Sequence, residues 1–139
     1  MSNSAHFRKL ERIFASSPCN DHIDTTIEVS EGYSEVTIKV RPDLLHSGGV
    51  LHGSVYFKAM DDAATFAANS LVEDAMVVTA SFTVYFVRPV SDGVITAKGR
   101  VVHQSRRLLI AEAEVVNSQG RQVARGSGTF MRSRLPTAS

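Results

Sequence analysis

The residues best suited to chemistry lie in a glycine-rich loop over residues 45–54 and in the helix predicted to follow it. The loop contains His46 and Gly53, and the alanine-rich helix contains the adjacent acids Asp61 and Asp62. Backbone N–H groups in the first turn of a helix have no acceptor within the helix, so the Gly53 amide can polarise a carbonyl group. A carboxylate near an apolar acyl group can act as a general base or a nucleophile.

The two acids differ in their expected surroundings. Adjacent residues point about 100° apart around a helix axis, so only one carboxylate faces a given site. Asp61 shares its i+3 and i+7 positions with alanines, whereas Asp62 shares them with Thr65 and Asn69. We therefore expect Asp61 to point inward and Asp62 to be exposed or hydrogen-bonded. The alternative for Asp61 is a solvated helix residue.

The loop also has simpler explanations. Its glycines can serve only to form a turn, and His52, at the helix start, can bond to nearby backbone. His46 and His52 also suit ligands or acid–base groups, but their spacing to Asp61 is poor for a metal, and Cys19 is the only cysteine. We expect no metal site. The glycines are not followed by a Lys-Ser/Thr pair, which excludes a phosphate-binding P-loop.

Further candidates lie in the second half of the chain, where basic residues outnumber acidic ones. Thr79 belongs to a predicted strand, and its hydroxyl either lines a sheet face or assists chemistry. Arg88, Arg106 and Arg107 lie near predicted turns, where arginines either hold phosphates or are simply solvated. The basic half either serves an anionic ligand or balances the acidic first half.

The elements that must position these residues follow from hydropathy patterns. Apolar residues recur at helical spacing over 4–17, and strand-like alternation covers 23–29 and 36–40. A buried helix is predicted over about 52–71. Four further strands are predicted, over 76–87, 94–103, 108–117 and 122–131. The order favours an α+β single domain in which a curved antiparallel sheet wraps around a central helix, the hotdog fold.

Composition is consistent with one compact domain. The chain has 139 residues, of which 43% are hydrophobic, and a formal net charge of +1. We assign residues 1–20 to a covering helix and linker, 21–132 to the hotdog domain and 133–139 to a flexible tail. A single cysteine and the lack of a secretion signal or a membrane-length apolar run favour a cytoplasmic protein with no membrane partner.

Two motifs carry a resemblance to a known family. Residues 49–53 read GVLHG, with Asp61 nine residues after His52, and residues 85–89 read YFVRP. With the element order, they resemble the hotdog-fold acyl-CoA thioesterases, in the phenylacetic-acid-pathway (PaaI-like) branch of the 4-hydroxybenzoyl-CoA thioesterase superfamily. The resemblance covers nearly the whole chain. It implies hydrolysis of an acyl-CoA thioester to free acid and coenzyme A, with no nucleic-acid partner.

The resemblance also implies roles for particular residues. Asp61 would be the base or nucleophile, the Gly53 N–H would polarise the thioester carbonyl, Thr79 would assist the water or the acid, and His52 would support the loop. The residues implied in binding substrate are Val50 and Leu51 beside the thioester arm, and Arg88, Gln104, Arg106 and Arg107 at the nucleotide and phosphates. No cofactor is implied, because coenzyme A is part of the substrate.

The chain departs from the family pattern at two positions. Ser54 replaces a frequent second glycine, with little expected effect. His46 replaces a more usual asparagine that helps to hold water or substrate, so we expect activity to be pH-sensitive near neutrality.

Helix geometry limits how the Gly53 amide and the Asp61 carboxylate can act together. Gly53 and Asp61 are eight residues apart and therefore stand about 12 Å apart along one helix, whereas a reacting centre needs both within roughly 3 Å. We therefore expect a homodimer with two sites across its interface. Helix geometry leaves dimer and tetramer open, and a homotetramer, a dimer of dimers, is our expectation for the assembly. The sequence does not identify the acyl group of the substrate, because the depth of the pocket depends on how Tyr56, Phe57 and Met60 pack with Phe82.

Two alternative functions are weighed against hydrolysis. One is a non-catalytic acyl-CoA-binding or sensing module, which the absence of an output domain disfavours. The other is a hotdog hydratase or dehydratase, in which a histidine and an acid act on one substrate. Those enzymes carry a histidine in a different surrounding motif, whereas His52 here precedes a glycine in the thioesterase manner.

Overall fold

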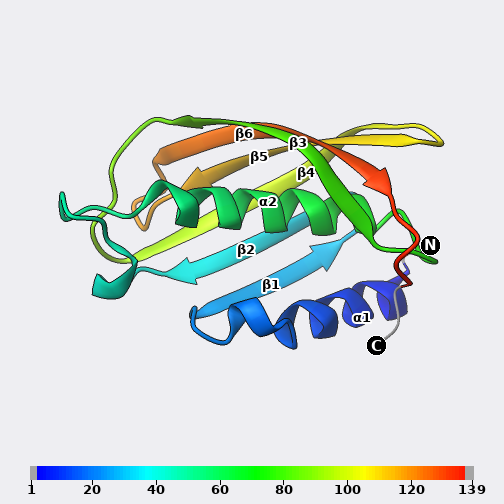
Figure 1. The fold of residues 1–139 in the computed structure, drawn as a ribbon, viewed down its shortest axis with the longest axis horizontal. Coiled ribbons are helices and arrows are strands. Elements are labelled where there is room, and N and C mark those ends of the chain that lie inside the picture. Colours follow the sequence, from blue (N-terminus) through cyan, green and yellow to red (C-terminus); the bar gives the residue numbers. More distant parts are fainter. Residues whose placement is uncertain (1–2, 137–139) are drawn as a thin grey trace.

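The computed structural model describes residues 3–136, which form a six-stranded antiparallel sheet curved around one long helix (Figure 1). The strands lie in the order β1-β2-β4-β5-β6-β3. Their bounds are β1 Thr25–Ser30, β2 Tyr33–Lys39, β3 Val77–Phe86, β4 Val94–Gln104, β5 Leu108–Val116 and β6 Gln122–Arg132. The helices are α1 Ser4–Ala15 and α2 Gly53–Asn69, with short 3₁₀ turns η1 Pro18–Asn20 and η2 Pro42–Leu44. The α+β hotdog fold predicted from the sequence is confirmed.

The central helix α2 lies directly on the sheet because small residues face each other at the contact. A Cβ atom on Gly99 of β4 would stand 2.5 Å from the carbonyl of Ala63, so only glycine allows this approach. The buried Ser34 hydroxyl of β2 donates to the same carbonyl at 2.6 Å. Ten of the seventeen residues of α2 are buried. The alanine-rich composition of α2 therefore allows the helix to pack closely on the sheet.

Element ends differ from the sequence predictions by a few residues. β1 begins at Thr25 rather than at residue 23, and β2 begins at Tyr33, three residues before its predicted start, because the turn at Gly32 is tight. Gly32 has a φ of +65°, which glycine adopts without strain. The helix α2 ends at Asn69 because the Asn69 side-chain amide donates to the carbonyls of Val72 and Ala75, in the turn that follows.

The N-terminal helix covers one side of the core, as its amphipathic pattern predicted. Phe7, Leu10 and Phe14 are buried, and Phe14 meets Phe66 of α2 edge to face at 5.6 Å. The predicted flexible tail, 133–139, includes residues 137–139, which lie outside the described residues. In its described part, Ser133 N donates to Met76 O, and Met76 N donates to Leu135 O.

The edge strand β3 exposes apolar side chains. Val78 is 41% exposed, Tyr85 62% and Phe86 58%, and Val87, directly after the strand, is 49% exposed. On its other side β3 pairs with β6, with a bulge between Thr79 and Ser81. Among the described residues, no helix is both long enough and apolar enough to cross a membrane.

Candidate active site

Asp61 lies on the side of α2 that faces β3. The Thr79 hydroxyl of β3 donates to Asp61 Oδ1 at 2.7 Å, so the strand holds one carboxylate oxygen in place. Thr65 Oγ1 lies 3.5 Å from Thr79 Oγ1 on the same side. The sequence analysis grouped Thr65 with Asp62, which was wrong, since residues four apart share a helix face as well as residues three apart. The spacing of four residues from Asp61 to Thr65 was therefore the sequence signal that places Thr65 on the same side of the helix as Asp61.

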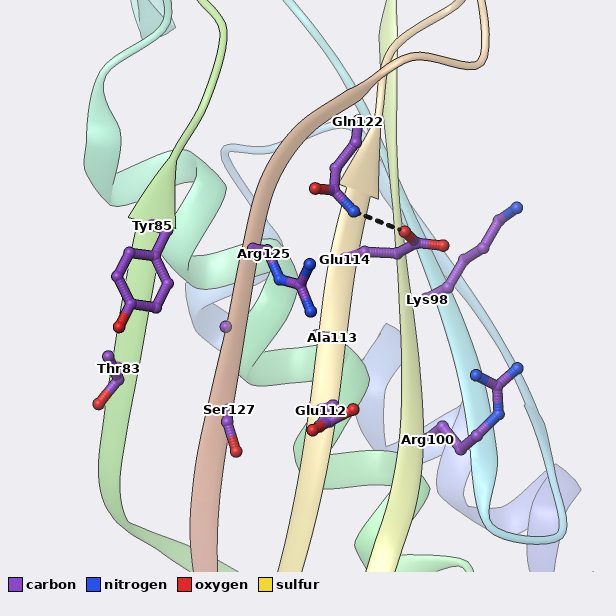
Figure 2. Close-up of a pocket in the computed structure, with 11 residues that line it drawn as sticks. Thr83, Tyr85, Lys98, Arg100, Glu112, Ala113, Glu114, Gln122, Arg125 and Ser127 are labelled. Atoms are coloured by element: carbon purple, nitrogen blue, oxygen red, sulfur yellow. Dashed lines mark hydrogen bonds between the residues drawn. The ribbon is translucent and has the colours of Figure 1, made fainter.

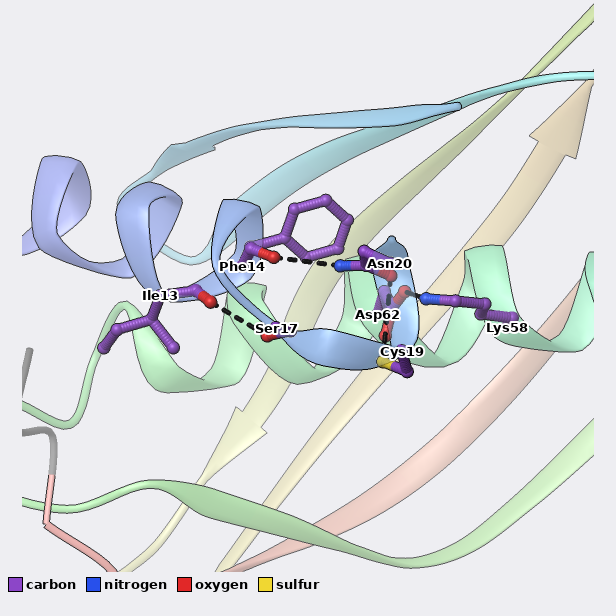
Figure 3. A network of polar contacts seen from close by, with 7 residues as sticks. All are labelled: Ile13, Phe14, Ser17, Cys19, Asn20, Lys58 and Asp62. Carbon is purple, nitrogen blue, oxygen red and sulfur yellow. Dashed lines mark hydrogen bonds and ion pairs between the residues drawn. The ribbon is translucent and has the colours of Figure 1, made fainter. Parts of the chain in front are cut away.

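Asp62 lies on a different side of α2, toward α1 (Figure 3). Its carboxylate pairs with Lys58 Nζ at 2.6 Å, and the same ammonium lies 5.7 Å from the centre of the Phe14 ring. Burial raises the pKa of the Asp62 carboxyl above its ordinary value, although the Lys58 ammonium partly opposes this. Asp62 is hydrogen-bonded, as expected, and it points away from the groups that contact Asp61.

The glycine-rich loop is organised by two histidine rings that accept backbone N–H groups two residues further on. His46 Nδ1 accepts from Gly48 N at 2.8 Å, and His52 Nδ1 accepts from Ser54 N at 3.0 Å, which makes His52 the N-cap of α2. Each acceptance requires an unprotonated Nδ1, so a neutral ring carries its proton on Nε2. A Cβ on Gly48 would stand 2.7 Å from His46 Cε1, which explains that glycine.

Gly53 is the first residue of α2, where a backbone N–H has no intrahelical acceptor. Within residues 3–136, no hydrogen bond uses its amide as donor. A Cβ on Gly53 would approach the Phe86 ring to 3.2 Å, so the two groups are neighbours. The Gly53 amide is therefore a free donor beside the C-terminal end of β3.

A pocket of about 300 Å³ opens beside the Gly53 amide. Tyr56 forms one wall of the pocket, and its hydroxyl donates to Arg88 O at 3.1 Å. Burial raises the pKa of this phenol above its ordinary value. The pocket-lining residues are His46, Val50, Leu51, Gly53, Tyr56, Phe86, Val87, Arg88 and Pro89. The structure thus brings together five residues selected from the sequence, His46, Val50, Leu51, Gly53 and Arg88.

The remaining basic candidates lie at the opposite end of the sheet. Arg106 and Arg107 form the β4–β5 turn, beside Gln104, and Arg132 Nε donates to Arg106 O. The strand register places this turn next to the start of β3, whereas Arg88 follows the end of β3. Within one chain, Arg88 therefore cannot share a ligand with the three residues at the β4–β5 turn.

The candidate residues of each chain thus fall into two separate groups, which we call half-sites. The acid half-site comprises Asp61, Thr79 and Thr65, and the amide half-site comprises Gly53 and the pocket beside it. The helix rise places Gly53 about 12 Å from Asp61. No group of three or more His, Cys, Asp or Glu side chains in the described part of the chain is arranged to hold a metal ion.

A larger hollow, of about 530 Å³, lies on the outer face of the sheet, away from α2 (Figure 2). It is lined by outward-facing side chains of β3 to β6, including Lys98, Arg100, Glu112, Glu114 and Arg125. None of the site residues selected from the sequence lines it. Basic and acidic side chains alternate from strand to strand here, which is the arrangement that favours cross-strand pairing.

Comparison with known proteins identifies relatives of this chain. A family model described as the thioesterase superfamily matches residues 48–124. The acyl-coenzyme A thioesterase PaaI of Escherichia coli is 32% identical over 99 residues, which cover 70% of this chain and 69% of that protein.

Solved structures show the same fold. The structure of the E. coli PaaI protein, from the phenylacetic acid degradation operon, has a TM-score of 0.84 and 26% identity, covering 94% of this chain and 98% of that one. A thioesterase family protein from Silicibacter pomeroyi has a TM-score of 0.82 and 28% identity, covering 89% and 95%. The chain belongs to the thioesterase superfamily and is a PaaI-like hotdog thioesterase.

Proposed function

We propose that this thioesterase hydrolyses acyl-CoA thioesters to the free carboxylic acid and coenzyme A. The observation that carries the proposal is that one helix presents both a carboxylate held in place and a backbone amide with no acceptor. Asp61 is held by the Thr79 hydroxyl at 2.7 Å, and the Gly53 N–H has no acceptor in the described chain. The name of the E. coli relative supports acyl-coenzyme A as the substrate class.

In the proposed reaction, the Gly53 N–H donates to the thioester carbonyl oxygen and stabilises the negative charge that develops there. Asp61 either takes a proton from water, whose oxygen then attacks the carbonyl carbon, or attacks that carbon itself. The carbon–sulfur bond breaks, and the sulfur leaves as the thiolate of coenzyme A, which then takes up a proton. In the second route, water hydrolyses the resulting anhydride. Thr79 orients the carboxylate in either case.

One active site in this proposal combines half-sites from two chains. An amide and a carboxylate about 12 Å apart on one helix cannot both lie within roughly 3 Å of one carbonyl. A homodimer resolves this conflict when each chain supplies its amide to one site and its carboxylate to the other. The same exchange brings Arg88 of one chain toward the partner's Arg106 and Arg107, where they can hold the phosphates of coenzyme A. Two such dimers form the proposed homotetramer.

The loop residues support the amide half-site. His46 and His52 each direct Nδ1 to backbone, which leaves Nε2–H as a donor in the neutral ring. We assign His46 to holding the water or the substrate, and His52 to fixing the start of α2. Val50 and Leu51 line the same pocket as Gly53, and we assign them to contacts with the thioester arm of the substrate. The mechanism uses no metal or organic cofactor, and the free Cys19 suits a cytoplasmic enzyme.

The test compares two adjacent substitutions of the same kind. Asp61→Asn removes the attacking or basic carboxylate and is expected to lower the rate of coenzyme A release by about a hundredfold or more. Asp62→Asn, the matched control, is expected to retain most of the rate, because Asp62 pairs with Lys58 and faces α1.

Coenzyme A release is followed with a thiol reagent over short, long and aromatic acyl-CoAs. Wild-type rates in Asp61→Asn would refute the assignment. Binding of these acyl-CoAs without release by the wild-type chain would instead identify a binding module, and a change at the enoyl-thioester absorbance band would identify a hydratase.

A further inference from the structure

The Tyr56 side chain joins the start of α2 to the segment 87–90, which follows β3. We propose that Tyr56 is a positioning residue for Arg88: its hydroxyl fixes the direction from which the Arg88 guanidinium approaches the phosphates of coenzyme A. This inference rests on the proposed function and adds to it a group that sets the affinity for the nucleotide end of the substrate.

Tyr56 is buried beside the amide half-site. It follows Gly53 by three residues, about one turn of α2, and is only 4% exposed. Its ring meets the Phe86 ring at 5.6 Å and an angle of 69°, and a Cβ on Gly53 would approach the same Phe86 ring to 3.2 Å. The Tyr56 ring is therefore held by packing at the wall of the pocket, which fixes where its hydroxyl lies.

The Tyr56 hydroxyl contacts the backbone on both sides of Pro89. It donates to Arg88 O at 3.1 Å. The Val90 N–H bonds to the phenol oxygen and partly opposes the rise in the pKa of Tyr56 that burial causes. Within residues 3–136, no other group donates a hydrogen bond to the Arg88 carbonyl. The phenol is therefore the group that orients this carbonyl.

The Arg88 backbone is fixed at both peptide planes that flank its Cα atom. Its N–H donates to Val123 O at 3.1 Å, and its carbonyl accepts from Tyr56. Because peptide units are planar, fixing both planes fixes φ and ψ, and with them the direction of the Arg88 Cβ. Loss of the Tyr56 hydroxyl would release the second plane and let the Arg88 side chain change direction.

The Arg88 guanidinium suits a phosphate ligand. Arg88 is exposed, and among the described residues that line the pocket it is the only lysine or arginine, with no Asp or Glu beside it. Its Nη1 donates to Gln122 O at 2.7 Å, which uses one of the five N–H donors of a guanidinium. The other donors can pair with phosphate oxygens, and such pairing depends on orientation because the guanidinium is a planar fork. A misdirected Arg88 would therefore weaken phosphate binding and leave the thioester contacts intact.

Tyr56→Phe removes the hydroxyl and keeps the ring that packs on Phe86. The KM for an acyl-CoA is expected to rise about three- to tenfold, the range for loss of one hydrogen bond, at unchanged kcat. The KM for the same acyl group on pantetheine, which lacks the nucleotide and its phosphates, is expected to stay unchanged. Tyr33→Phe is the matched control, since it removes a phenol hydroxyl that donates to Glu35 at 2.7 Å in β2, and it is expected to change neither KM.

A double variant tests whether the effect passes through Arg88. Arg88→Ala alone is expected to raise the KM for the acyl-CoA, and Tyr56→Phe is expected to add little in that background, because no guanidinium remains to be positioned. Effects of the two substitutions that multiply independently would overturn the positioning role. An unchanged KM in either single variant, an equal rise for the pantetheine thioester, or a fall in the kcat of Tyr56→Phe would also overturn it.

Binding of free coenzyme A separates the positioning role from the proposed function, because titration calorimetry requires no hydrolysis. Tyr56→Phe is expected to weaken coenzyme A binding by the same factor as the rise in KM and to leave pantetheine binding unchanged. Weaker coenzyme A binding by the variant of a chain that hydrolyses no acyl-CoA means that the positioning role stands and the function fails. Hydrolysis by the wild type with equal coenzyme A affinity in both proteins means that the function stands and the positioning role fails. A wild-type chain that does not bind coenzyme A overturns the positioning role.

Discussion

Mixing two inactive variants tests whether one active site draws on two chains. Gly53→Pro removes the amide proton and adds a ring whose Cβ lies near Phe86. Gly53 is the first residue of α2, which is the helix position that proline prefers. The preceding His52 has φ −65° and ψ 141°, the extended conformation that proline favours before it. Gly53→Ala is the matched control, since it keeps the N–H and also places a Cβ near the Phe86 ring.

The expected magnitudes follow from the two roles. Loss of one donor to a developing oxyanion lowers turnover by about 10²–10³, or roughly 2.7–4 kcal/mol. Asp61→Asn is also expected to be nearly inactive. A mixed dimer of the two variants has one site with both native groups and one site with neither. Random pairing makes half of all dimers mixed, so the mixture is expected to regain about a quarter of wild-type turnover.

Coenzyme A release is measured after the two variants are unfolded and refolded together, with each variant refolded alone as reference. A second control mixes Asp61→Asn with the double variant Gly53→Pro/Asp61→Asn, which is expected to regain nothing. If tagged chains show that mixed dimers have formed and the activity stays at the level of the single variants, the two-chain site is refuted. An active Gly53→Pro variant would refute the role of the amide.

Three further predictions concern neighbouring residues. His46→Asn is expected to retain or raise turnover, because an asparagine oxygen can accept the Gly48 N–H as His46 Nδ1 does; turnover below about a hundredth of wild type contradicts this. Thr65→Val is expected to lower kcat severalfold at unchanged KM, with Thr65→Ser restoring it, because the hydroxyl lies beside Thr79; equal kcat values for the two variants would exclude this role. Folding raises the pKa of Asp62 above 3.8, so the folded chain binds that proton more tightly, and this carboxyl lowers stability as pH rises above that value. The unfolding free energy of Asp62→Asn relative to wild type is therefore expected to be higher at about pH 7 than at about pH 3.5 in urea titrations, and a pH-independent difference would contradict it.

Sequence patterns were sufficient to predict the fold because several elements repeat a simple period. The alternation in β2 and β5 matches the burial of every second residue, and helical spacing in α1 matches the burial of Phe7, Leu10 and Phe14. The turn glycines at positions 32, 93 and 120 have positive φ angles, which is the conformation that such turns require. Local rules of this kind do not depend on which elements later become neighbours.

The candidate site was harder to predict from the sequence than the fold, because its contacts join elements far apart in sequence. Helix spacing favoured Asp61 as the inward acid, but its bond to Thr79 depends on β3 crossing beside α2, which no local pattern encodes. The positions of Arg106 and Arg107, at the other end of the sheet from Arg88, likewise follow from the strand order rather than from spacing. Strand pairing sets which residues share an end of the sheet.

The division into half-sites follows from the length of one helix. Eight residues separate Gly53 from Asp61, and the rigid rise of α2 turns that spacing into about 12 Å. A shorter spacing would bring both groups within reach of one carbonyl in a single chain. A spacing of eight instead gives each group its own neighbour on β3, Phe86 for the amide and Thr79 for the acid, with Phe57 and Phe82 between them. In the proposed dimer, the same interval that keeps one chain from completing a site therefore provides the repeat that two chains need to complete a pair of sites.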